Sequence, residues 1–105
     1  MAQFHVYANT NPVTRSIYPY LLDIQSNLLR DLRTTIVIPL SPAGIAGKAA
    51  IGTLCPEVEV NGQPYIVMTQ QLAGVDRKIL ADEVGDLSAW RPAIIAALDF
   101  VISGF

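Results

Sequence analysis

The single histidine and the single cysteine are the residues of this chain with the clearest potential for nucleophilic or metal chemistry. His5 lies in a short alternating segment near the N-terminus, and Cys55 stands between Leu54 and Pro56. A catalytic Cys–His pair is one interpretation, whereas a lone free thiol in an apolar chain is usually a small buried hydrophobic side chain. No CxxC or HxxxH spacing occurs, and a metal site needs more ligands than these. The sequence therefore predicts no catalytic residue, no metal and no cofactor.

Three acidic residues, Asp82, Glu83 and Asp86, form a second group that could do acid–base chemistry. They come just before a segment with a helical pattern, where the helix dipole favours negative charge. Helix capping is therefore the favoured interpretation, with acid–base catalysis as the alternative. The glycines follow neither a GxxxxGK nor a GxGxxG pattern, so a nucleotide phosphate site is not supported.

The composition describes a small apolar chain without a basic surface. It has 105 residues, of which 51% are hydrophobic and 15% are charged, with a mean hydropathy of +0.39, a net charge of −2 and a pI near 5.1. This length suits one domain, residues 1–105, with a single modest core. Because the cations are scattered, direct binding of nucleic acid is not expected. The excess of apolar residues favours a protein partner.

The sequence also bears on where the protein works. Since Cys55 has no disulfide partner within the chain, a reducing compartment fits, and we expect a cytoplasmic protein. The first residues lack the basic start and the apolar segment of an export signal. The longest apolar stretch, residues 93–102, is interrupted by Asp99 and is shorter than the roughly 20 residues that span a membrane. We therefore expect neither secretion nor membrane insertion.

Alternating and β-branched segments predict a β-rich body over about residues 1–86. The clearest signal is residues 57–69, because Asn61-Gly62 supplies the positive φ angles of a type I′ hairpin turn. Pro64 should then lie at an edge or near the start of its strand. Further strands are expected in residues 3–7, 20–25 and 35–40, with one more short strand within 72–80. Residues 41–52 are predicted to be a connector that could hold a helical turn.

The pattern of residues 88–104 predicts a C-terminal helix that stays apolar almost to the end of the chain. Ser88 is its expected N-cap. One stripe at helical spacing is apolar, and it comprises Ile94, Ile95, Leu98, Val101, Ile102 and Phe105. The opposite face carries one charge, Asp99, so the helix is expected to have two packing partners. Gly104 can form a left-handed cap, and the terminal Phe105 either completes the core stripe or is presented to a partner.

Several short motifs, taken in order, resemble the CcdB family. They are Gln3-Phe-x-Val-Tyr7, Asp23-Ile-Gln-Ser26, Val37-Ile-Pro-Leu40, Met68-Thr69, Glu83-Val-x-Asp86-Leu-Ser88 and the terminal Gly104. The resemblance spans nearly the whole chain, with a longer loop over residues 8–18. It implies a mainly β fold with a C-terminal α-helix, a five-stranded antiparallel SH3-like barrel that forms a homodimer. CcdB-like proteins are toxins of toxin–antitoxin systems and are associated with plasmid maintenance.

The resemblance implies a gyrase poison, which binds the A subunit of DNA gyrase and traps the cleaved DNA complex without catalysing a reaction. Carried over by position, the gyrase contacts are Leu28, Leu29, Asp99, Ile102, Ser103, Gly104 and Phe105. The implied dimer interface contains Phe100 and Val101. A CcdA-like antitoxin is implied at the first strand and the following loop, through Gln3, Tyr7, Arg15, Asp23 and Gln25.

Two positions depart from the family pattern. Ser103 stands where well-known toxins have a C-terminal tryptophan, and Asp99 stands where they have an amide. Loss of an aromatic anchor costs about 2 kcal/mol, or about thirtyfold in affinity, unless Phe105 substitutes for it. One alternative is therefore a degenerate relative that binds its antitoxin without poisoning gyrase. Another is an SH3-like ribonuclease toxin, but the Gly-x-Arg-Pro strand start typical of those enzymes is absent and the acidic pI disfavours RNA binding.

Overall fold

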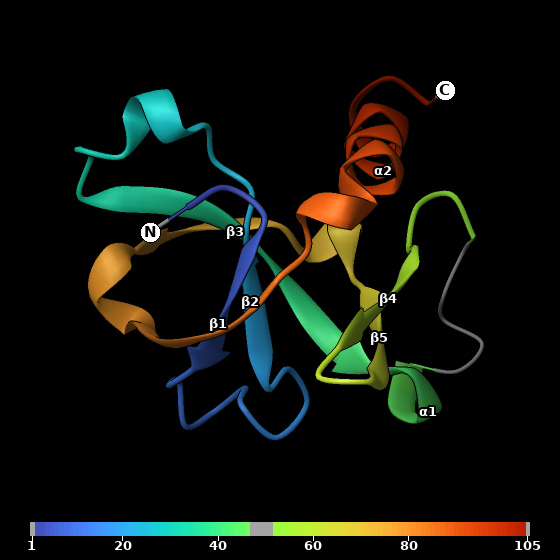
Figure 1. Cartoon of the computed structure of the whole chain (residues 1–105), viewed down its shortest axis with the longest axis horizontal. Helices are drawn as coiled ribbons and strands as arrows, with labels where there is room; N and C mark the ends of the chain where they lie inside the picture. Colours follow the sequence, from blue (N-terminus) through green and yellow to red (C-terminus); the bar gives the residue numbers. More distant parts are fainter. Residues whose placement is uncertain (1, 47–51, 105) are drawn as a thin grey trace.

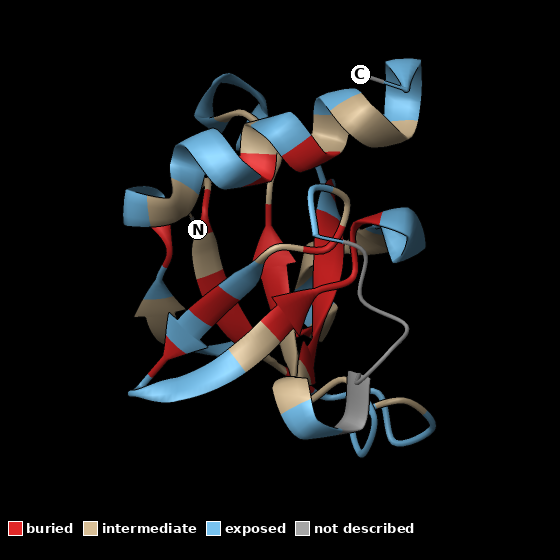
Figure 2. Cartoon of the chain, turned by 90° about the vertical axis from the view of Figure 1, so that its right-hand side faces the viewer, coloured by how far each residue is buried: buried red, intermediate tan, exposed pale blue. Residues whose placement is uncertain are grey.

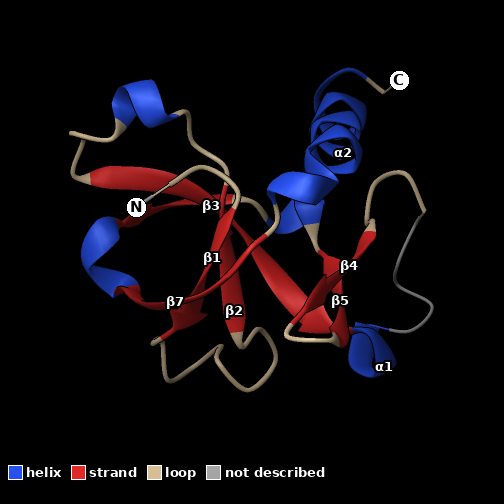
Figure 3. Ribbon diagram, viewed as in Figure 1, coloured by secondary structure: helices blue, strands red, loops and turns tan. Residues whose placement is uncertain are grey.

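An antiparallel sheet that bends around a core forms the body of the molecule (Figure 1). The computed structural model describes residues 2–46 and 52–104. In this part of the chain the sheet has seven strands in the order β4-β5-β3-β2-β1-β7, and β6 also pairs with β3. The strands are β1 (His5–Asn9), β2 (Tyr20–Asp23), β3 (Thr34–Pro42), β4 (Glu57–Val60), β5 (Gln63–Val67), β6 (Ala73–Asp76) and β7 (Leu80–Asp86). The α-helices are α1 (Ala43–Ala46) and α2 (Arg91–Ser103), and Figure 3 shows how little helix accompanies the sheet.

The longest strand, β3, organises the sheet because it is paired along both edges. On one edge β2 runs against it, from Tyr20 opposite Leu40 to Asp23 opposite Val37. On the other edge β5 and β6 pair with it in turn. Pro39 lies between these two pairings and has no N–H to donate, so a continuous ladder is not possible there. Its carbonyl still accepts a hydrogen bond from the N–H of Met68, where the chain leaves β5 (3.1 Å).

Alternate side chains along the strands enter two separate cores. Val6, Leu22 and Ile38 belong to the main core, which also receives α2. Their neighbours Leu21 and Val37 join a smaller cluster on the other face, together with Tyr7, Leu80, Val75 and Ile79. This two-residue period follows from the pleat of a strand. The predicted alternation of residues 20–25 is confirmed.

The fold class expected from the sequence is confirmed, with two more strands than the predicted five. The hairpin of β4 and β5 turns at Asn61 (φ 53°) and Gly62 (φ 79°), as its sequence predicts. Strand β7 was missed, because its acidic residues were interpreted as helix-capping residues. It pairs with β1 through two register shifts, and its outward carboxylates face solvent. An irregular, polar edge strand leaves little hydrophobic alternation to detect.

Helix α2 lies across the sheet and buries only the first part of its predicted stripe (Figure 2). Ile94 and Ala97 are fully buried, and Ile95 and Leu98 pack against the main core while partly buried. Ile102, predicted on the same stripe, is 81% exposed. Its exposure shows that the helix extends past the core. No helix within residues 2–46 and 52–104 is both long enough and apolar enough to cross a membrane.

The prediction that Ser88 is the N-cap of this helix is wrong. Residues Ser88–Trp90 form a 3-10 turn, and the α-helix begins at Arg91. Asp86 lies just before this turn, and its Oδ1 accepts hydrogen bonds from the Ser88 N–H (2.8 Å) and from the Ser88 hydroxyl (2.5 Å). These bonds favour the charged carboxylate and lower the pKa of Asp86 below its usual 3.8. The predicted capping role of the acidic group is not confirmed, because neither the 3-10 turn nor α2 has a side-chain hydrogen bond at its N-cap residue.

Truncation of Ile94 tests the contact between α2 and the sheet. Ile94→Ala should lower the free energy of unfolding by about 2–5 kcal/mol, because a fully buried side chain is lost and leaves a cavity. Ile102→Ala, the same change at an exposed position of the same helix, should change it by less than about 0.5 kcal/mol. Urea denaturation measures both. Equal effects would contradict the described packing of the helix.

Removal of the Asp86 carboxylate tests the start of the helix. Asp86→Ala should lower stability by about 1 kcal/mol at neutral pH, because the Ser88 N–H and hydroxyl lose their charged acceptor. Because the folded pKa lies below 3.8, this advantage of the wild type is present above pH 3.8 and is lost as pH falls through the folded pKa. Thermal melts at several pH values measure the difference. Asp82→Ala removes an exposed charge from the same strand and controls for net charge; an identical acid response of both variants would refute the stabilising role of the Asp86–Ser88 contact.

Candidate functional site

The C-terminal end of α2 is an exposed helix end with its own hydrogen-bonded closure. Asp99, Ile102, Ser103 and Gly104 are all exposed. The Ser103 hydroxyl donates to the backbone carbonyl of Asp99 (2.7 Å). Gly104 has φ 80° and donates its N–H to the carbonyl of Phe100 (2.9 Å), so the predicted left-handed cap is confirmed. The helix end is thus closed by its own residues, and Ile102 is left facing solvent.

Phe105, the last of the predicted gyrase contacts, lies outside the described residues. Phe100 and Val101, the predicted dimer contacts, are half-buried, and neither belongs to a core cluster of the part of the chain that the structure describes. Both side chains therefore keep apolar surface that another molecule could cover.

A second exposed apolar group lies on the connection between β2 and β3, residues 26–33, which we call the leucine loop. Leu28 is 94% exposed, Leu29 47% and Leu32 50%. The loop is built from tight turns: the Ser26 hydroxyl accepts from the Leu28 N–H, and the Leu32 N–H donates to the Leu29 carbonyl. The leucine loop and the end of α2 both lie toward the upper edge of Figure 1. The predicted gyrase contacts are thus contributed by two separate elements.

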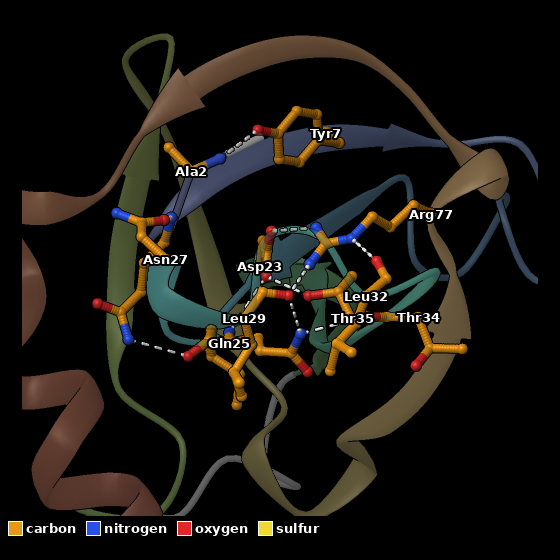
Figure 4. Close-up of polar contacts among 12 residues, drawn as sticks. Ala2, Tyr7, Asp23, Gln25, Asn27, Leu29, Leu32, Thr34, Thr35 and Arg77 are labelled. Carbon is orange, nitrogen blue, oxygen red and sulfur yellow. Dashed lines mark hydrogen bonds and ion pairs between the residues drawn. The ribbon is translucent and has the colours of Figure 1, made fainter.

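A buried charge network lies behind the leucine loop (Figure 4). The Asp23 side chain is only 3% exposed, and its Oδ1 accepts from the Thr35 hydroxyl (2.8 Å) and the Gln25 N–H (3.1 Å). Its Oδ2 lies 3.9 Å from Nη1 of Arg77, whose side chain is 16% exposed. The Gln25 side chain donates to the carbonyl of Thr34 (3.2 Å). The buried carboxylate therefore has a nearby guanidinium and two hydrogen-bond donors, as a buried charge requires.

The five predicted antitoxin contacts do not form one surface. Asp23 is buried, and Gln3 and Gln25 are half-buried beside it at one end of the β1–β2 pair. The Gln3 side chain donates to the Ile24 carbonyl (3.1 Å). Arg15 lies on the exposed loop at the opposite end of the pair. Tyr7 is buried between these ends; burial, the main cause, raises the pKa of its hydroxyl, which accepts from the N–H of Ala2.

A cavity of about 200 Å³ lies between the β1–β2 loop and β6. Asn9 and Tyr18 line its loop side, and Leu21, Val37 and Val75 line the sheet. The side chains that line it are aliphatic, amide, hydroxyl or phenolic, and none carries a charge or an imidazole. The buried amide of Asn9 donates to Thr14 and to the backbone carbonyl of Tyr18, which ties the loop to the strand. This cavity can hold a neutral group but has no strong acid or base with which to act on it.

The structure does not form the Cys–His pair considered from the sequence. Nδ1 of His5 contacts a carboxylate oxygen of Glu83 (2.7 Å), and Nε2 lies 3.6 Å from Asp86. Cys55 is buried in another cluster with Ile66 and Met68, and its thiol lies 3.2 Å from Oε1 of Gln70. Within residues 2–46 and 52–104, no three His, Cys, Asp or Glu side chains come together to hold a metal ion.

Arg77 belongs to the buried charge network although no sequence pattern indicates it. Its partner Asp23 lies on β2, whereas Arg77 follows β6, so no local pattern connects them. The sequence showed scattered cations, and only the pairing of β3 with both β2 and β6 brings these two side chains together.

The fold resembles those of several solved toxins. A mycobacterial endoribonuclease in complex with its cognate antitoxin superposes with a TM-score of 0.76 and 14% identity, covering 97% of this chain and 94% of its own. A toxin described as an Mtb toxin gives 0.71 and 19%, with coverages of 92% and 99%. The Mycobacterium tuberculosis toxin MazF-mt6 gives 0.63 and 18%, with coverages of 78% and 83%. At these identities the likeness concerns the fold.

The family of this chain follows from a match of its amino-acid sequence. The model of the CcdB protein family matches residues 3–104, which is nearly the full length of the chain and includes the strands, the leucine loop and α2. This chain therefore belongs to the CcdB family, and its fold is one that toxins of toxin–antitoxin systems share.

Proposed function

We propose that this protein is the toxin of a toxin–antitoxin pair and that it poisons DNA gyrase by binding its A subunit and trapping the cleaved DNA complex. It acts by binding, without catalysing a reaction. The observation that carries the proposal is the exposed apolar end of α2, where Ile102 remains 81% exposed on a helix that buries Ile94 and Ala97 in its first half. An apolar side chain on a projecting, capped helix end is well suited to enter a pocket of a partner.

The leucine loop provides the second contact in this proposal. Leu28 is almost fully exposed, and Leu29 and Leu32 are about half exposed beside it. Exposed apolar side chains that lie together indicate an interaction surface more strongly than isolated ones do. With the end of α2, the loop gives gyrase two apolar contacts from separate elements.

A homodimer and an antitoxin complete the proposal. Phe100 and Val101 retain apolar surface on α2 that a second copy would cover. One structural relative is an endoribonuclease described in complex with its cognate antitoxin. For this chain we propose a CcdA-like antitoxin that reaches Arg15 on the β1–β2 loop and Gln3 and Gln25 at the other end of the strands. Tyr7 and Asp23 would then support that surface from beneath, because both are buried.

The ribonuclease alternative has less support from the side chains. Cleavage of RNA needs groups that accept and donate protons and a cation that stabilises the phosphate. The cavity beside β1 is lined by neutral side chains, and His5 is engaged with two carboxylates, which would repel a phosphate. The fold that this chain shares with endoribonucleases is therefore not enough to propose their activity for it.

Substitution at the helix end tests the gyrase proposal. Ile102→Asp places a charge where an apolar contact is proposed, so the concentration needed to trap cleaved DNA with the host gyrase should rise about thirtyfold or more. Val13→Asp is the matched control, because Val13 is also 81% exposed but lies on the β1–β2 loop. The measurement is the amount of cleaved plasmid after the gyrase reaction is stopped with detergent. Failure of the wild type to trap cleaved DNA, or equal trapping by Ile102→Asp, would refute the proposal.

A second candidate function, antitoxin binding without gyrase poisoning, is favoured by one observation. Ser103 stands at the family's tryptophan position, and its hydroxyl is occupied by the Asp99 carbonyl. If the missing ring limits potency, Ser103→Trp should trap cleaved DNA at about thirtyfold lower concentration, because it restores an aromatic anchor. Ser103→Ala removes the same hydroxyl bond without adding a ring and should leave potency unchanged. The concentration of each variant that traps cleaved plasmid with the host gyrase measures both effects, and equal behaviour of the two variants would count against a role for the ring.

A further inference from the structure

The side chain of Arg77 reaches the leucine loop from a distant part of the chain. Arg77 begins the short turn η4 (Arg77–Ile79) between β6 and β7. Its Nε donates to the carbonyl of Leu32 (2.6 Å), and Nη2 donates to the carbonyl of Leu29 (3.2 Å). Its backbone N–H donates to the carbonyl of Arg33 (2.9 Å). One residue thus holds three carbonyls of the loop that carries the exposed leucines.

The same guanidinium faces the buried carboxylate of Asp23, with 3.9 Å between Nη1 and Oδ2. Asp23 in turn accepts from Thr35 at the start of β3 and from Gln25 just before the leucine loop. A carboxylate in this position needs a nearby cation, since an isolated buried charge is strongly unfavourable. The planar fork of an arginine can satisfy the carboxylate and two carbonyls at once. The core charge and the loop are therefore linked through one side chain (Figure 4).

The exposure of the leucines requires such a support. Leu28 and Leu32 are 94% and 50% exposed, although in a free loop these side chains would gain by turning inward and covering each other. A loop that is already ordered also pays less conformational entropy when it binds. We propose that Arg77 is a positioning residue that holds the leucine loop in its outward, binding-competent form. This inference depends on the proposed function for the partner that the loop meets.

The test replaces the guanidinium of Arg77 and keeps its positive charge. Arg77→Lys leaves a cation opposite Asp23, so the protein should fold, but a lysine cannot donate to both loop carbonyls in the same geometry. Hydrogen exchange of the Leu29, Arg30 and Leu32 amides should accelerate about tenfold or more, because these amides are protected by the turns of the loop. Amides of α2 should exchange as in the wild type. Arg33→Lys is the matched control, since that side chain is 83% exposed.

Binding to the purified A subunit of the host gyrase shows whether Arg77 acts through the loop. Arg77→Lys should weaken binding about tenfold, and so should Leu28→Ala, but the double variant should be no weaker than the single ones. Combination with Ile102→Ala, at the other contact, should instead multiply the two losses.

Two results would overturn the inference: unchanged exchange in Arg77→Lys, or losses that multiply with Leu28→Ala. If Leu28→Ala alone leaves gyrase binding unchanged, the loop is not a gyrase contact and the binding role of Arg77 fails with it. The helix-end contact would still be judged separately, by Ile102→Asp. Failure of this inference is therefore distinguishable from failure of the gyrase proposal.

Discussion

The two-sided pairing of β3 is the constraint on which the rest of the structure depends. Its backbone is shared between β2 on one edge and β5 and β6 on the other, so every other strand takes its position directly or indirectly from it. Because side chains alternate across the pleat, the same register sends Ile38 to the core under α2 and Val37 to the smaller cluster behind it. A shift by one residue would exchange the two cores, and Pro39 limits where the second-edge partners can continue.

The buried carboxylate of Asp23 is a second constraint, because a buried charge must keep its partners in place. It ends β2 just before the leucine loop, opposite Val37 of β3, and its partners are Gln25, Thr35 of β3 and Arg77 in the turn after β6. A buried charge tolerates little rearrangement of its partners, because each lost contact leaves a polar group uncompensated. The compensation of the buried Asp23 charge by Arg77 thus also holds in place a surface loop that makes few apolar contacts of its own.

Helix α2 packs against the core with one part and leaves an apolar side chain exposed on another. Its first half stabilises the fold through Ile94 and Ala97, which are completely buried on the sheet. Its last turn extends beyond that support, and its backbone is closed by Ser103 and Gly104 instead of by packing. Local capping therefore replaces tertiary contacts at this end, which allows an apolar side chain to remain exposed on a regular helix. The buried and the exposed apolar side chains are therefore separated along one element.

The sequence by itself determined the elements whose signal is local. The Asn61-Gly62 turn needs positive φ angles, residues 20–25 alternate with the period of a strand, and Gly104 ends an apolar helical stripe; all three are confirmed. Strand β7 and the start of α2 were assigned wrongly, because acidic residues suit both an edge strand and a helix cap. Only the tertiary structure decided that Tyr7 and Asp23 are buried and that Arg77 donates to two carbonyls of the leucine loop. The physical reason is that these roles arise from contacts between residues far apart in the chain, and such contacts exist only after the register of β3 with β2 and β6 is set.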